Sequence, residues 1–229
     1  MEILKNNFFL LFYAVAFALA LTKLPKYYDS ILKYFPILIA YTLCTEFLGM
    51  FVLNYDDINL VFKKGFLNHT KIIYNIYDII FFTYFYYLYW NSISNQQIKK
   101  LIKYGAVLFL ISMLINILIK DPFIYDMWYA YTFGVFLLIV AICYYLYAIR
   151  KDSFTLKFSN LLFWISIGTL VFHMGYLPIM IIQSNSTGLS MENARLLRYT
   201  HLSLIVIMYV CYIIGFLVMK RMPSMKSKA

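Results

Sequence analysis

The sequence predicts an all-α polytopic membrane protein with seven transmembrane helices, and three observations lead to this fold class. The chain of 229 residues is 63% hydrophobic and only 13% charged, whereas a soluble domain is about 45–50% apolar and about 25% charged. Its apolar residues form long unbroken runs instead of the alternating segments of about ten residues that mark a membrane β-barrel. Its basic residues gather in alternate connections between those runs. We therefore expect one seven-helix transmembrane domain over residues 1–229, with the lipid bilayer as its solvent and no soluble domain.

The apolar runs have the length that a membrane span requires. A helix needs about 20 mostly apolar residues to cross a bilayer. Seven segments meet or nearly meet that length, and the first and the fourth are the shortest. In chain order the predicted spans are 7–24, 35–53, 71–90, 101–119, 127–149, 160–182 and 199–219.

The distribution of Lys and Arg predicts the orientation of these spans. The connections after the first, third and fifth spans carry three basic residues each, and the C-terminal tail carries four; the opposite side holds the remaining seven. Cytoplasmic loops of membrane proteins carry the excess of Lys and Arg. The sequence therefore predicts an N-terminus outside, a C-terminus in the cytoplasm and a multi-pass location in the cell membrane.

The first span has a competing interpretation. Residues 8–20 end in AFALA, which resembles the small-residue cleavage site of a secretory signal peptide. Cleavage would leave six spans and would move the connection that holds Lys99, Lys100 and Lys103 to the outside, against the charge rule. We therefore expect this segment to remain as the first span.

The seventh span is expected to begin before it enters lipid. Ser190 precedes Glu192 and Asn193, and a serine ahead of an acidic first turn is a helix-start signal. The sequence thus predicts a solvent-exposed stretch of helix ahead of residues 199–219.

Two carboxylates lie at the same predicted depth in the membrane. Asp78 follows Lys71 by seven residues, which puts it on the order of 10 Å below the outer surface at the rise of an α-helix. Glu46 precedes Leu53 by seven residues, so it lies at about the same depth. Asn75 is one turn above Asp78 on the same helix face. A charge at this depth costs a few kcal/mol and faces the helix bundle or a cavity, so we expect both carboxylates to turn away from lipid.

The other strongly polar side chains of the spans fall in the same outer half. His173 lies about 13 Å down in the sixth span, and Asn116 lies near the outer end of the fourth. The seventh span contributes polar groups at its outer entrance, and the inner half of the spans holds no Asp, Glu or His. The sequence therefore predicts a polar ligand-binding pocket open to the outside, lined by Glu46, Asn75, Asp78, Asn116, His173 and His201, with Arg198 near its mouth.

These residues also have structural interpretations. Asp78 would pair with His201 or Arg198 and lock two helices together, and a protonated Glu46 would bond a Tyr or Thr of a neighbouring helix. The two histidines and Asn116 would be interhelical hydrogen-bonding groups or would be wetted at the interface. Two carboxylates at one depth also repel, which calls for a cation: a histidine, Arg198, a metal or a cationic ligand. The shared depth of all these groups favours a binding site.

An outer pocket, together with a cytoplasmic face on which no domain is expected, favours a receptor-like or sensor-like module. Such a module binds a small or cationic ligand outside the cell and signals through a separate cytoplasmic partner. The basic residues are accounted for by topology, so nucleic-acid binding is not expected.

Besides a structural or assembly subunit, two other functions remain open. A small-solute transporter is one, although carrier sites lie near the midplane at broken helices, and no polar residues lead on towards the cytoplasm here. An intramembrane enzyme, with or without a metal, is the other, because two His and two acids are zinc-ligand types. An enzyme is disfavoured, since the chain contains no HExxH or HxxxH pair. The cofactor and any metal stay unknown.

The three cysteines, Cys44, Cys143 and Cys211, all fall inside apolar runs. They are not spaced as zinc ligands and do not lie in loops where a disulfide forms. We expect them to be buried small apolar side chains, as free cysteines usually are.

Overall fold

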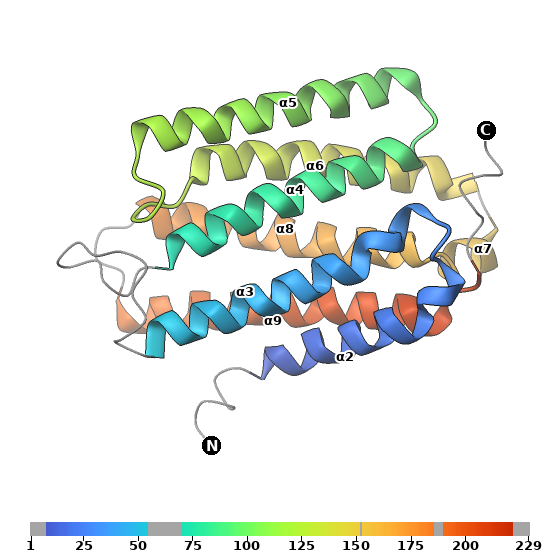
Figure 1. Ribbon diagram of the computed structural model, residues 1–229, viewed down its shortest axis with the longest axis horizontal. Coiled ribbons are helices and arrows are strands. Elements are labelled where there is room, and N and C mark those ends of the chain that lie inside the picture. Colours follow the sequence, from blue (N-terminus) through green and yellow to red (C-terminus); the bar gives the residue numbers. More distant parts are fainter. Residues whose placement is uncertain (1–7, 55–69, 152, 186–189, 222–229) are drawn as a thin grey trace. The chain divides into compact units, whose positions relative to one another are not determined.

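The fold was obtained as a computed structural model (Figure 1) that describes residues 8–54, 70–151, 153–185 and 190–221. Every regular element within these ranges is a helix. Six helical segments are long and apolar enough to cross a membrane, which confirms the all-helical, multi-pass class. These segments are Phe9–Lys26, Ile31–Leu53, Gln96–Ile119, Trp128–Ala148, Leu161–Gln183 and Met191–Val218.

The helix over the third predicted span is not among these six. This helix, α4 (Lys71–Ser92), has 22 residues, about 33 Å at the rise of an α-helix, so its length suffices. It carries six tyrosines together with Asn75 and Asp78, and these side chains lower its mean hydropathy. The helix expected over residues 71–90 is therefore present.

The chain separates into two compact units. The first comprises Met1–Ile39 and Ile142–Ala229, and the second comprises Ala40–Ala141. Because the unit boundaries fall inside α3 (Phe35–Asn54) and α6 (Trp128–Ala148), both helices contribute to both units.

The first unit is built on α8 (Leu161–Asn185) and α9 (Met191–Val218), which pack along each other, while α2 (Phe9–Lys23) packs along α9 (Figure 1). Gly168 permits the close approach of α8 to α9. A Cβ atom at this position would lie 2.8 Å from the backbone oxygen of Met208. A backbone atom cannot rotate away as a side chain does, so the contact requires glycine.

Aromatic side chains fill the space around α9. The rings of Tyr13 and Tyr209 meet edge-on with centroids 4.1 Å apart, and those of Phe35 and Tyr212 do so at 5.4 Å. The hydroxyls of Thr169 and Tyr212 share a buried hydrogen bond of 2.7 Å. This bond matters because a buried hydroxyl without a partner costs about 1–3 kcal/mol.

Short helices complete the first unit. Tyr27 is buried in the connection after α2 and donates its hydroxyl to the carbonyl of Ala20, so that the chain folds back onto α2. The short elements are η1 (Leu24–Lys26), η2 (Ile31–Tyr34), η3 (Ile149–Lys151) and α7 (Phe154–Phe158).

The second unit holds most of α3, α4, most of α6, and α5 (Gln96–Ile119), which packs along α4. Its core is aromatic. The Phe82 ring lies 5.2 Å from that of Phe109 on α5 and 5.4 Å from that of Tyr131 on α6, between centroids. The Tyr86 hydroxyl donates to the carbonyl of Gly134 at 2.9 Å, which ties α4 to α6.

Two helices begin earlier than the spans predicted for them. α9 begins at Met191, where the Ser190 hydroxyl accepts a hydrogen bond from the Asn193 N–H at 3.3 Å. This confirms the predicted helix start, and Arg195 is exposed in the early turns of α9. α5 begins at Gln96 rather than at residue 101, because the side chain of the preceding Asn95 accepts bonds from two backbone N–H groups and caps the helix.

The expected burial of all three cysteines is wrong. Cys44 on α3 and Cys143 on α6 are exposed, and Cys211 on α9 is half-buried; all three are free. A helix that is apolar on every side has no stripe that distinguishes its packed face from its outward face. The sequence therefore placed these residues in the correct helices without identifying the face.

Candidate functional site

The α3–α4 interface contains a carboxylate and a tyrosine that meet each other. The Tyr74 hydroxyl donates to Oε2 of Glu46 at 3.5 Å, which is at the long limit of a hydrogen bond. Gly49 lies one turn along α3 from Glu46, and a Cβ there would lie 2.7 Å from the Tyr74 hydroxyl oxygen. The missing side chain at Gly49 therefore leaves the room that the hydroxyl occupies.

A second pair of polar groups lies beside the first. Thr42, one turn before Glu46 on α3, donates its hydroxyl to the Tyr77 hydroxyl at 3.4 Å. The rings of Tyr41 and Tyr77 stack with centroids 6.0 Å apart and an interplanar angle of 17°. The interface thus combines hydroxyl groups, aromatic faces and one half-buried carboxylate.

Asp78 follows Tyr77 on α4 and is half-buried. Within the described part of the chain, no hydrogen bond or ion pair reaches its carboxylate. Asp126, in the connection that Asn75 binds, carries a like charge, and the two carboxylates repel each other. Glu46 likewise forms no ion pair with a described residue, so two carboxylates on adjoining helices lack a positive partner there.

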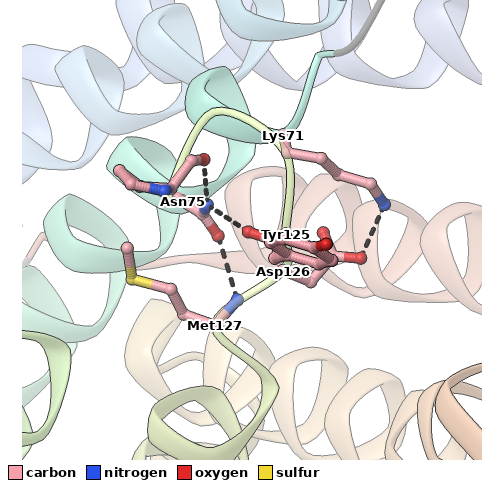
Figure 2. A network of polar contacts seen from close by, with 6 residues as sticks. Lys71, Asn75, Tyr125, Asp126 and Met127 are labelled. Atoms are coloured by element: carbon pink, nitrogen blue, oxygen red, sulfur yellow. Dashed lines mark hydrogen bonds and ion pairs between the residues drawn. The ribbon is translucent and has the colours of Figure 1, made fainter. Parts of the chain in front are cut away.

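Asn75 has a defined structural role one turn above Asp78. Its side chain is buried and bonds the connection between α5 and α6: it donates to the carbonyls of Pro122 at 2.8 Å and Tyr125 at 3.0 Å, and accepts from the Met127 N–H at 3.3 Å (Figure 2). These three bonds use both donors and an acceptor lone pair of the amide. The amide is committed to this loop.

Asn116 is also committed, within its own helix. Its side chain donates to the carbonyl of Ser112 at 3.0 Å, and its backbone carbonyl accepts from the Lys120 N–H at 2.8 Å where α5 ends. Both bonds are local to the last turns of α5.

The two histidines of the predicted pocket belong to the first unit. The His201 ring stacks on that of Tyr176 with centroids 4.3 Å apart, and the Phe172 ring is 5.9 Å away. His173 is buried and meets the edge of Phe172 at 5.0 Å. Arg198 is exposed three residues before His201 on α9. His201 therefore lies among aromatic rings between α8 and α9, whereas His173 lies beside an aromatic ring of its own helix.

The seven predicted site residues divide between the two units. The second unit holds Glu46, Asn75, Asp78 and Asn116; the first holds His173, Arg198 and His201. A pocket that unites the two sets stays a prediction. A metal site gains no support, since no group of three or more His, Cys, Asp or Glu side chains in the described residues is arranged to hold an ion.

Two sets of polar contacts in this region were not predicted from the sequence. One is the ion pair between Lys71 at the start of α4 and Asp126 in the α5–α6 connection, with Nζ and Oδ2 2.6 Å apart. The other is the set of loop backbone groups that Asn75 binds. The signal that could have found the ion pair is that both charges flank spans on the side predicted to be outside.

Comparison with family models, with curated proteins and with solved structures finds no match for the chain.

Proposed function

We propose that the chain is a receptor-like or sensor-like membrane module that binds a small cationic ligand at the outer half of the α3–α4 pair and signals through a separate partner. The observation that carries this proposal is the half-buried Asp78 carboxylate, which no described residue bonds. Glu46 adds a second carboxylate at about the same depth. Such groups are costly in a membrane, so an ionisable residue there is by default a candidate functional site.

The chemistry around Asp78 favours an organic cation. The Tyr41 and Tyr77 rings present aromatic faces on the same helix pair, and aromatic faces attract ammonium groups through their quadrupole. The Tyr74 hydroxyl already bonds Glu46, which leaves Asp78 as the stronger acceptor for a ligand. A cation here offsets the repulsion from Asp126.

The proposal includes a seventh span and an orientation. α4 is long enough to cross the roughly 30 Å hydrocarbon core, and most of its tyrosines lie in its second half, as in an aromatic belt at a membrane interface. With the N-terminus outside and the C-terminus in the cytoplasm, the Lys71–Asp126 end of the second unit faces outward. A transporter and a metal-dependent enzyme gain no supporting observation from the described residues.

A melting screen of the purified protein in detergent tests the proposal. Wild type and Asp78→Asn are heated with alkylamines, tetramethylammonium, polyamines, Ca²⁺ and Zn²⁺. We expect an organic cation to raise the melting temperature of wild type, since a ligand at a hundred times its Kd stabilises by about 2.7 kcal/mol. Asp78→Asn should stay folded and lose that rise.

Glu192→Gln is the matched control, because it removes an exposed carboxylate in the first turn of α9. It should respond to cations as wild type does. The proposal fails if no cation stabilises wild type, or if Asp78→Asn is stabilised to the same degree.

A further inference from the structure

The connection between α5 and α6, residues 120–127, is a folded turn in its own right. The Asp121 side chain accepts a hydrogen bond from the Phe123 N–H at 3.0 Å. The Asp121 carbonyl accepts from the N–H groups of Ile124 at 3.2 Å and Tyr125 at 3.0 Å. These bonds all lie within the turn.

Two sets of contacts, here called fastenings, hold this turn against α4. The first fastening is neutral and buried. Asn75 is 3% exposed and reaches both ends of the turn, at Pro122 and at Met127 (Figure 2). The Met127 N–H precedes α6, and its bond to Asn75 spans elements that are far apart in sequence. Buried neutral hydrogen bonds respond little to salt.

The second fastening is charged and open to solvent. Lys71 and Asp126 form an ion pair of 2.6 Å, and their side chains are 39% and 51% exposed. An exposed pair of this kind is weak and is screened by salt. Lys71 lies four residues before Asn75, so the two fastenings follow one face of α4.

Asp78 is the next residue on that face, three after Asn75. Because Lys71 and Asn75 hold the turn on this face, Asp126 and Asp78 lie on the same side of α4, where like charges repel. Among the described residues, the ammonium group of Lys71 is the one positive charge that pairs with Asp126. A further cation entering this region would compete with Lys71 for Asp126.

We propose that residues 120–127 form a strap over the outer end of α4, with a permanent fastening at Asn75 and a releasable one at Lys71–Asp126. A cation that takes Asp126 from Lys71 loosens the strap on the face that carries Asp78. The consequence for access to Asp78 rests on the proposed function, whereas the release of the ion pair does not.

Hydrogen–deuterium exchange of the full chain in detergent micelles tests the strap. The readout is the exchange of peptides covering residues 120–127, in which the Met127 amide reports the permanent fastening at Asn75 and the other amides report the charged one. In wild type we expect exchange to be about two- to fivefold faster near 1 M NaCl than at low salt, since the screening length falls to about 3 Å and an exposed pair contributes little more than that factor. In Lys71→Gln, exchange should already be fast at low salt and should not respond to NaCl.

Two further variants sharpen the test. Lys103→Gln removes an exposed lysine of α5 outside the strap and should match wild type at every salt concentration. Asn75→Asp keeps an acceptor for Met127 but loses both donors, so its strap should exchange at least about tenfold faster at any salt concentration.

The strap is ruled out if Lys71→Gln and wild type exchange alike, or if NaCl accelerates both equally. Because Lys71 is exposed, its variant is expected to fold even if the Asn75 variant does not. If exchange in the strap responds to salt but no cation stabilises the protein in the melting screen, the strap is supported and the proposed cationic ligand is contradicted. If a cation stabilises the protein but exchange in the strap does not respond to salt, the ligand is supported and the strap is contradicted.

Discussion

At the scale of single residues, the carboxyl group of Glu46 finds a tyrosine instead of a cation. The Tyr74 hydroxyl lies 3.5 Å from its Oε2 atom, in the space that Gly49 leaves open. This agrees with the structural interpretation in which Glu46 bonds a tyrosine of a neighbouring helix. It leaves Asp78, not Glu46, as the carboxylate that needs an explanation.

Removal of the Tyr74 hydroxyl tests this pairing. We expect Tyr74→Phe to lower the free energy of unfolding by about 0.5–1 kcal/mol, at the low end for a hydrogen bond because the distance is long. In a Glu46→Gln background the same change should cost a different amount, since residues in contact are not additive. The measurement is a double-mutant cycle by denaturant unfolding in detergent. Strict additivity of the two changes would contradict the contact.

At the scale of helices, the α8–α9 pair depends on glycines that differ in what surrounds them. At Gly168 a Cβ would lie 2.8 Å from the Met208 carbonyl oxygen, a backbone atom. At Gly175 the nearest atoms are the methyl groups of Leu204, at 2.7 and 2.8 Å. A leucine can change rotamer, whereas a backbone can yield only if the helices move apart.

The two glycines should therefore respond differently to alanine. Gly168→Ala should destabilise the protein by about 1–3 kcal/mol, the usual cost of an overpacked contact. Gly175→Ala should cost less or be neutral, because alanine favours helix over glycine by about 1 kcal/mol and Leu204 can shift. Melting temperatures of both variants in one detergent give the comparison. Equal losses would mean that the α8–α9 contact yields as readily at Met208 as at Leu204.

At the scale of the whole molecule, orientation decides whether the α4 carboxylate faces the medium. The distribution of basic residues predicts that the C-terminus is cytoplasmic. We expect a reporter fused after Lys228 to read as cytoplasmic in intact cells. An epitope tag inserted in the connection 54–70, of which residues 55–69 lie outside the described residues, should be reached from the medium. A tag that is labelled only after the cells are permeabilised would overturn the predicted orientation and with it the outward-facing site.

Several features of this protein were determined by the sequence alone. The all-helical membrane class followed from the composition and from the lengths of the apolar segments, because neither quantity depends on which helices are in contact. The start of α9 after Ser190 could also be predicted from the sequence, since a capping side chain bonds backbone groups within the first turn of the helix. These are local or average properties.

The tertiary structure alone decided which polar groups meet. Asn75 was predicted to line a pocket with Asp78, yet it bonds a turn about fifty residues further along the chain, and Lys71 pairs with Asp126 across a similar separation. The burial of the cysteines was misjudged for the same reason. Depth follows from counting residues along one helix, but the direction of a side chain around that helix is set by its neighbours. When a helix is apolar on all sides, its own sequence does not show which side packs against a neighbouring helix.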